Sequence, residues 1–143
     1  MKVRTILARK GTHVATTPPD RILREAVTML VEQNIGSLVV VDWSGQPIGL
    51  LSERDVIRKA VTHPNVFDLE VAEVMTTNLI TVLPDEDVQS VANTMTERRI
   101  RHLPVLEEGR LVGIISIGDV VKAQRDQYRG EIDTLQMQLE NET

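Results

Sequence analysis

The stretch Gly113-Ile114-Ile115-Ser116-Ile117-Gly118-Asp119 decides the fold, because it repeats an earlier stretch, Gly49-Leu50-Leu51-Ser52-Glu53-Arg54-Asp55. Each copy contains a glycine, two apolar residues, a serine and, three residues later, an aspartate. Two more apolar residues follow each aspartate. This pattern is typical of a strand that ends at the serine, where a helix begins. We therefore expect the same strand-to-helix junction to occur twice in the chain.

Each junction lies at the end of a longer unit of sequence, which also occurs twice in the chain. Before the first junction, apolar residues at helical spacing over 23–30 predict an amphipathic helix, and the β-branched run 38–41 predicts a buried strand. Asp20 and Asp85 are predicted to cap the first helix of each unit, because their carboxylates can accept its free amides. Asn34 is predicted to end the first of these helices in the left-handed conformation. Each unit thus has the order strand, helix, strand, strand, helix.

A unit of this length buries too little apolar surface to be stable alone, so the two units must cover each other's sheets. The sequence therefore predicts an α/β (α+β) fold of two βαββα units related by a pseudo-two-fold axis. A short N-terminal helix is predicted from Val3, Ile6 and Leu7, and a long C-terminal helix from the end of the chain. Within one module spanning 1–143, the predicted bounds are about 8–61 for the first unit, 62–70 for a linker, about 71–124 for the second unit and 125–143 for a helical tail.

The tail carries an apolar seam whose phasing resembles that of a coiled coil. Arg125 falls on this seam, and Gly130 lowers the helix propensity of the tail. Two readings stay open: the tail packs back on its own domain, or it contacts a second copy in a dimer. The apolar members of the seam are Val121, Tyr128, Ile132, Leu135 and Leu139.

Composition excludes several classes of function. The chain has 143 residues, a net charge of -5 and no cysteine, so disulfides, thiolate zinc sites and cysteine nucleophiles are excluded. The three histidines share no short ligand spacing, and we expect no metal site. We also expect no enzyme, because the sequence has no glycine-rich phosphate loop and no nucleophile elbow. No apolar run spans a membrane and the N-terminus lacks a signal peptide, so a cytoplasmic protein is expected.

The chemistry of the repeated junction favours a nucleotide. The free amides and positive potential of a helix N-terminus attract phosphate, and a serine hydroxyl there can add a hydrogen bond. An aspartate one turn into the helix can accept from both ribose hydroxyls, and aliphatic strands beside the junction can hold adenine. The alternative is a helix capping box, since Ser-x-x-Asp before an apolar run also forms one without any ligand.

The doubled motif, together with the segments 35–41 and 100–105, resembles a tandem CBS-domain pair, or Bateman module. The resemblance covers nearly the whole chain. The chain is similar to small stand-alone CBS-domain proteins. It implies a module that binds AMP, ADP, ATP, NAD or S-adenosylmethionine and requires no cofactor. Adenine nucleotides, AMP first among them, or NAD are the expected ligands. The resemblance also implies a homodimer that acts on another, unknown protein.

The resemblance also implies which residues bind. It places Asp55 and Asp119 on ribose, and Ser52 and Ser116 near phosphate or ribose. Residues after the first helix of each unit line the clefts, and the opening strand of the other unit closes each cleft. The remaining candidates for nucleotide binding are Leu50, Ile114, Gly36, Ser37, Arg101, His102, Thr16, Thr17, Asn78, Ile80, Arg54 and Arg99.

The two clefts are expected to differ. The second unit has a positive cluster from Arg98 to His102 that suits phosphate, whereas Arg54 is the nearest cation in the first unit. Unequal affinities are therefore predicted. The leading reading is a non-catalytic nucleotide sensor that regulates a partner in trans. Two others stay open: a structural interaction module with empty clefts, and a nucleic-acid binder, which the acidic balance opposes.

Overall fold

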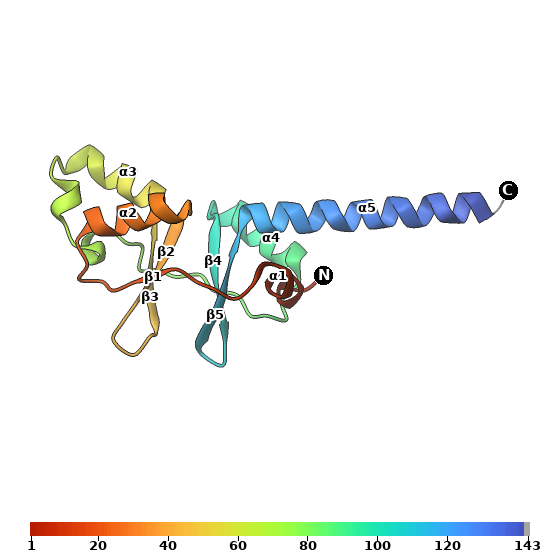
Figure 1. Ribbon diagram of the computed structural model, residues 1–143, viewed down its shortest axis with the longest axis horizontal. Helices are drawn as coiled ribbons and strands as arrows, with labels where there is room; N and C mark the ends of the chain where they lie inside the picture. Colours follow the sequence, from red (N-terminus) through yellow and green to blue (C-terminus); the bar gives the residue numbers. More distant parts are fainter. Residues whose placement is uncertain (142–143) are drawn as a thin grey trace.

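The computed structural model describes residues 1–141 and shows two βαββα units side by side, with a long helix extending from the second (Figure 1). The first unit comprises β1 (Thr16–Thr17), α2 (Leu23–Gln33), β2 (Ser37–Val41), β3 (Pro47–Ser52) and α3 (Glu53–Thr62). The second comprises α4 (Val88–Arg98), β4 (His102–Glu107), β5 (Arg110–Ser116) and α5 (Ile117–Asn141). The helix α1 (Val3–Lys10) precedes the first unit, and the 3-10 turns η1 (Val66–Asp68) and η2 (Val71–Glu73) lie between α3 and α4.

The two sheets have matching topology. In the first unit β1 runs parallel to β2, which pairs with β3 in a hairpin. In the second unit β4 and β5 form the hairpin, and the opening strand is reduced to a parallel bridge from Val82 to Val105. In both units the hairpin ends at the serine of the repeated motif, because Ser37 pairs with Ser52 and His102 with Ser116.

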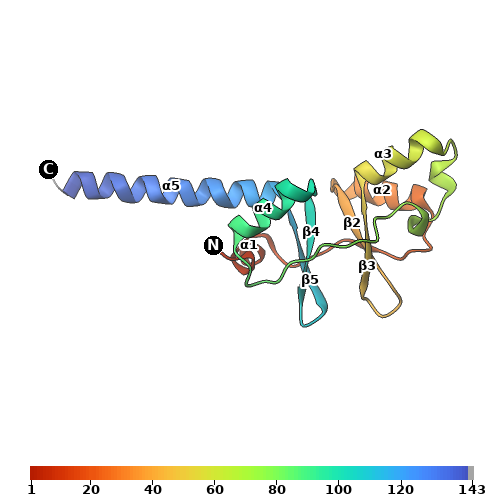
Figure 2. The same ribbon diagram turned by 180° about the vertical axis from the view of Figure 1, so that it is seen from behind.

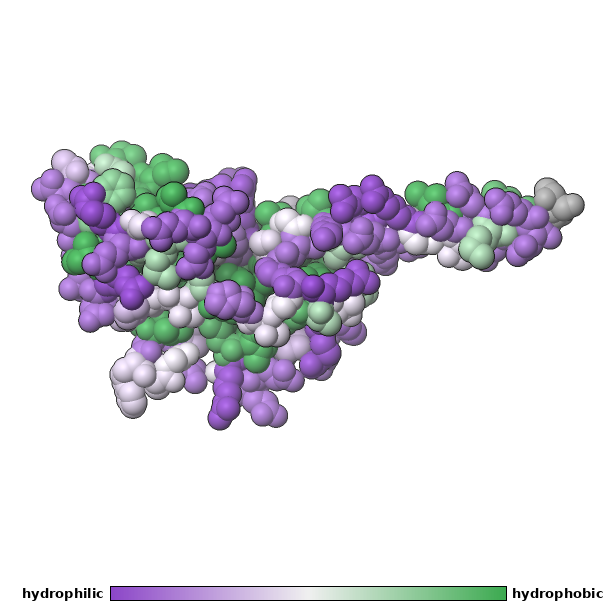
Figure 3. All heavy atoms as spheres, viewed as in Figure 1, coloured by the Kyte–Doolittle hydropathy of each residue, from purple (hydrophilic) through white to green (hydrophobic). Residues whose placement is uncertain are grey.

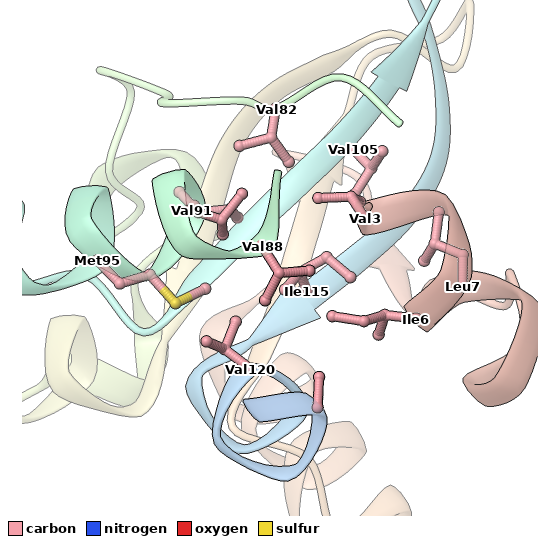
Figure 4. Packing of buried hydrophobic residues seen from close by; sticks show 12 residues of the cluster. Val3, Ile6, Leu7, Val82, Val88, Val91, Met95, Val105, Ile115 and Val120 are labelled. Atoms are coloured by element: carbon pink, nitrogen blue, oxygen red, sulfur yellow. The ribbon is translucent and has the colours of Figure 1, made fainter. Parts of the chain in front are cut away.

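The segment of the chain that precedes one unit packs into the core of the other unit. Val3, Ile6 and Leu7 of α1 pack among the buried residues of the second unit, around Val88 and Ile115 (Figure 4). In return, Val66, Val71 and Val74, which lie between α3 and α4, are buried in the core of the first unit. This exchange explains why neither unit would hold its core alone, and it makes the pair one cooperative body.

The exchanged segments also explain the glycine that opens each copy of the motif. A Cβ atom built on Gly49 would lie 2.5 Å from Sδ of Met75, and one built on Gly113 would lie 2.6 Å from Cδ2 of Leu7. Met75 and Leu7 belong to the exchanged segments. The glycine is therefore required by close packing across the units, rather than by an unusual backbone conformation.

The predicted aspartate caps were wrong. The residues at the N-cap positions are Ile22 and Asp87, and neither caps its helix with a side chain. Instead, the first amides of the two helices donate to carbonyls of the exchanged segments: Leu23 N to Leu69 O at 2.8 Å, and Val88 N to Met1 O at 2.9 Å. These long-range hydrogen bonds satisfy helix amides that a capping side chain was expected to satisfy. The predicted left-handed end at Asn34 is confirmed, with φ 52° and ψ 50°.

The tail is a continuation of α5 and does not pack back on the domain. Val120 and Ala123 are the buried residues of α5, and every residue over 127–141 is exposed. In both ribbon views this part of the helix stands clear of the body (Figures 1 and 2). The first of the two readings of the tail was therefore wrong. Residues 142 and 143 of the predicted tail lie outside the described part of the chain.

Candidate functional site

The first junction is a complete capping box. Asp55 N donates to Ser52 Oγ at 3.2 Å, and Ser52 N donates to Asp55 Oδ2 at 2.9 Å. The Ser52 hydroxyl also donates to Oδ2 of Asp55, and Thr76 Oγ1 donates to Oδ1 at 2.9 Å. The carboxylate is therefore held in place mainly through Oδ2. Because a carboxylate oxygen has two lone pairs, Oδ1 keeps capacity for a further donor.

The second junction has the same capping bonds but a different neighbour. Ser116 N donates to Asp119 Oδ2 at 2.9 Å, and Asp119 N donates to Ser116 Oγ at 3.1 Å. Here Lys10, the last residue of α1, donates from Nζ to Asp119 Oδ2 at 2.6 Å and to Ile114 O at 2.9 Å. Burial alone would raise the pKa of Asp119, but the bonds from Lys10 and Ser116 hold it below the ordinary value. The second aspartate is thus neutralised within the chain.

A cavity of about 450 Å³ lies at the first junction, between the two units. This volume falls within the usual range of small-ligand pockets. Its apolar wall comes from both units and from the linker. The lining residues are Gly36, Leu50, Ser52, Glu53, Arg54, Asp55, Ile57, Arg58, Thr76, Asn78, Leu79, Ile80, Arg99, Ile100, Arg101, His102 and Pro104.

The positive charge of both units converges on this first cavity. Arg54 and Arg58 come from α3, one turn apart and beside Asp55, while Arg99 and Arg101 come from the loop between α4 and β4. Two carboxylates, Glu53 and Asp55, oppose these four guanidinium groups in the lining. Arginine recognises phosphate through paired donors. The cavity therefore offers carboxylate acceptors for ribose next to an excess of phosphate donors.

The second cavity, of about 320 Å³, lies at the pseudo-symmetric position. Lys10 lines it and also lines a small pocket of about 100 Å³ that contains Asp119, whereas Asp119 is not in the lining of the second cavity. Lys10 thus lies between that cavity and the aspartate. The residues that line the second cavity are Lys10, His13, Val14, Ala15, Gln33, Asn34, Ile35, Gly36, Ser37, His102, Ile114 and Ser116.

His102 lines both cavities and is the side chain nearest to Gly36, on which an added Cβ would lie 3.3 Å from the imidazole Cε1. Burial lowers the pKa of His102, and the charge of Lys10 lowers it further, against smaller opposite effects of Glu53 and Asp119. The imidazole between the two cavities is therefore neutral at pH 7.

The structure brings most of the sequence-predicted residues to one cavity or the other. Thr16 and Thr17 line neither, because both lie in β1 and pair with β2, and Thr17 is only 1% exposed. The residues just before them, from His13 to Ala15, line the second cavity instead. The first cavity contains the predicted Gly36, Leu50, Ser52, Arg54, Asp55, Asn78, Ile80, Arg99, Arg101 and His102, and the second contains Gly36, Ser37, His102, Ile114 and Ser116.

Sequence reasoning missed several residues of the sites, and three of them have polar or charged side chains that matter for binding. Thr76 and Arg58 in the first cavity and Lys10 in the second were not predicted. Arg58 could have been found, because it lies one turn beyond Arg54 on the same helix. The contacts of Thr76 and Lys10 depend on the exchange of segments between the units, which leaves no local signal in the sequence.

Over residues 1–141, no group of three or more histidine, aspartate and glutamate side chains could hold a metal ion. Over the same range, no helix has both the length and the apolar character that crossing a bilayer requires.

The CBS domain profile matches this chain twice, over residues 3–62 and 71–126. The chain belongs to the CBS-domain family. Among the relatives of this CBS-domain protein is the mitochondrial CBS domain-containing protein CBSX3 of Arabidopsis thaliana, 36% identical over 121 residues. The match covers 81% of this chain and 59% of that relative, so the chain spans less than two thirds of it.

Solved structures show the same fold. The CBS-domain containing protein ATU1752 of Agrobacterium tumefaciens superposes with a TM-score of 0.85 at 38% identity, covering 87% of this chain and 99% of that one. The CBS domain pair of protein MJ0100, in complex with 5'-methylthioadenosine and S-adenosyl-L-methionine, superposes with a TM-score of 0.75 at 30% identity. This match covers 89% of the present chain and 98% of the MJ0100 chain. A CBS pair of this fold therefore binds adenosyl ligands.

Proposed function

We propose that this CBS-domain protein is a non-catalytic sensor that binds an adenosine-containing nucleotide in the first cavity and acts on a partner protein in trans. The single observation that carries the proposal is the placement of Asp55 beside four arginines in one cavity between the units. The adenosyl ligands in the MJ0100 complex support the class of ligand.

Each part of a nucleotide has a counterpart in the first cavity. The Asp55 carboxylate, held by Ser52 and Thr76, would accept from the ribose hydroxyls through its less occupied oxygen. Leu50 and Ile80, which both line the cavity, would contact the adenine. The guanidinium groups, with the positive potential at the start of α3, would hold the phosphates. AMP, ADP, ATP and NAD all combine these three parts.

The second cavity is proposed to bind such ligands more weakly or not at all. A ribose there would have to replace Lys10 on Asp119, and the two charged groups are already paired at 2.6 Å. The lining of the second cavity holds Lys10 and two histidines but no arginine. The proposed inequality therefore favours the site that contains Asp55, although the sequence suggested that the cations of the second unit would serve their own cleft.

A structural module with empty clefts is the second candidate, because both aspartates complete capping boxes without any ligand. Thermal melting with AMP, ADP, ATP, NAD and S-adenosylmethionine separates the two. A ligand of the folded state at 100 times its Kd adds about 2.7 kcal/mol, which raises the midpoint by several degrees. GTP, with the same phosphates and another base, is the control. A midpoint that no adenosine compound raises above the GTP value would favour the structural module.

A further inference from the structure

The outer part of α5 is a helix without a core. All residues over 127–141 are exposed, and the cluster of buried residues in the second unit ends at Ala123. Isolated helices of about 12–15 residues are marginal in water, because most helical stability in proteins comes from packing. Packing of this part of α5 on a partner surface would therefore stabilise it. In the space-filling view it carries hydrophobic as well as hydrophilic atoms along its length (Figure 3).

One face of this helix repeats with coiled-coil spacing. We call it the tail seam: Val121, Arg125, Tyr128, Ile132, Leu135 and Leu139. Steps of four and three residues alternate along it, which keeps these side chains on one stripe. Apart from Arg125, its members are apolar and between 54% and 64% exposed. The family profile ends at residue 126, so most of the tail seam lies beyond the part of the chain that the family shares.

The charges of the helix divide at its middle. The half nearer the body, over 121–129, carries Lys122, Arg125 and Arg129 against one acid, Asp126, which lies 3.7 Å from Arg125, while the outer half over 131–141 carries Glu131, Asp133 and Glu140 and no cation. Two such helices in parallel would place Arg125 against its own counterpart in the seam. In antiparallel arrangement each basic half meets an acidic half, and the bodies lie at opposite ends, where they do not collide.

We propose that the tail seam pairs with the tail seam of a second copy of this chain in an antiparallel helix dimer. One register aligns every position: Val121 opposite Leu139, Arg125 opposite Leu135 and Tyr128 opposite Ile132 of the second copy. Glu131 of the second copy, one turn from its Leu135, then lies within the reach of Arg125. The pairing does not depend on nucleotide, so it can hold or fail independently of the proposed sensor function.

The mass of the protein in solution tests whether the tail seam pairs with a second copy of the chain. Light scattering is measured for the wild type, for Ile132→Glu in the tail seam and for Met137→Glu, which adds the same charge at an exposed apolar residue outside the seam. We expect Ile132→Glu to halve the mass of the wild type and Met137→Glu to leave it unchanged. Thermal melting of each variant reports whether the body stays folded. A monomeric wild type, or equal masses for all three proteins, overturns the proposal.

Disulfide trapping tests the direction, because the chain has no cysteine of its own. In air, Arg125→Cys/Leu135→Cys is expected to form a covalent dimer on a non-reducing gel, since the two positions face each other in the antiparallel register. Leu135→Cys alone is expected to stay uncrosslinked, because its counterpart lies far along the other helix. Dimers from Leu135→Cys alone would indicate parallel pairing and would overturn the antiparallel register.

Discussion

Lys10 Nζ lies 2.6 Å from Asp119 Oδ2, whereas Asp55, at the same place in the other copy of the motif, accepts a hydrogen bond from Thr76 at 2.9 Å. The two aspartates occupy matching positions at the starts of α5 and α3, yet one is paired with a cation and the other with a hydroxyl. This difference sets the chemistry of the two clefts, because Oδ1 of Asp55 is bonded to a hydroxyl rather than to a cation and can still accept from an external donor.

Lys10→Met is expected to lower the free energy of unfolding at neutral pH by about 1 kcal/mol, as for a partly exposed ion pair. The pKa of Asp119 lies below its ordinary 3.8 in the folded chain. Its contribution is therefore present above that value and is lost as the pH falls through the folded pKa. Urea titrations from pH 7 to pH 3 should show the wild type and Lys10→Met converging. A constant difference, equal to that of exposed Lys2→Met, would show that the pair does not stabilise the fold.

His102→Gln is expected to make the protein less sensitive to mild acid. The folded pKa of His102 lies below the ordinary 6.5, so the unfolded chain takes up its proton first as the pH falls. The wild type should lose stability below pH 6.5 relative to His102→Gln, with the two curves parallel above it. The exposed His63→Gln should follow the wild type throughout. Parallel curves for all three proteins across this range would contradict a buried neutral imidazole.

Replacing a glycine by alanine is expected to destabilise the protein at a packed position of the motif and to stabilise it at an open position of the tail. Gly113→Ala should cost about 1–3 kcal/mol, because its Cβ would press on Leu7 of the exchanged segment. Gly130→Ala, in open space on α5, should instead stabilise the helix by up to about 1 kcal/mol. Chemical denaturation measures both. Equal effects at the two positions would remove the packing explanation for the motif glycine.

Arg99→Asn is expected to weaken ATP binding about tenfold or more while leaving adenosine binding nearly unchanged, because a charge-assisted bond to phosphate contributes about 1.5–3 kcal/mol. Arg99 has φ 54° and ψ 42°, close to the angles of Asn34 at the same place in the first unit. Asparagine tolerates this left-handed conformation, so the change removes the charge and keeps the turn. Fluorescence titration with both ligands measures the effect. Equal loss for ATP and adenosine would place Arg99 away from the phosphates.

The sequence predicted those features that depend on neighbours along the chain. The hairpins, the junctions at Ser52 and Ser116, and the left-handed end at Asn34 follow from local pattern and from the backbone freedom of single residues. The caps expected at Asp20 and Asp85 are absent, because carbonyls of the exchanged segments accept hydrogen bonds from the first amides of these helices. No local pattern could report these bonds.

The candidate site, too, could be predicted from the sequence only where it depends on neighbours along the chain. The sequence identified Asp55 and the arginines, but it did not place Arg99 and Arg101 in the cavity of Asp55. That placement follows from how the units face each other. The contact of Lys10 with Asp119 likewise joins residues at opposite ends of the chain. Thr16 and Thr17 were nominated two residues too late, because the pattern of a short strand does not report where its exposed end begins.

Calorimetric titration of ATP into Asp55→Asn and Asp119→Asn tests the central claim most directly. Asparagine can still cap a helix, so both variants should fold, and each carries the same change in the same motif. We predict that Asp119→Asn binds a single ATP per chain with an affinity near that of the wild type, whereas Asp55→Asn loses at least about tenfold in affinity. Equal affinities for the two variants, or a greater loss in Asp119→Asn, would contradict it.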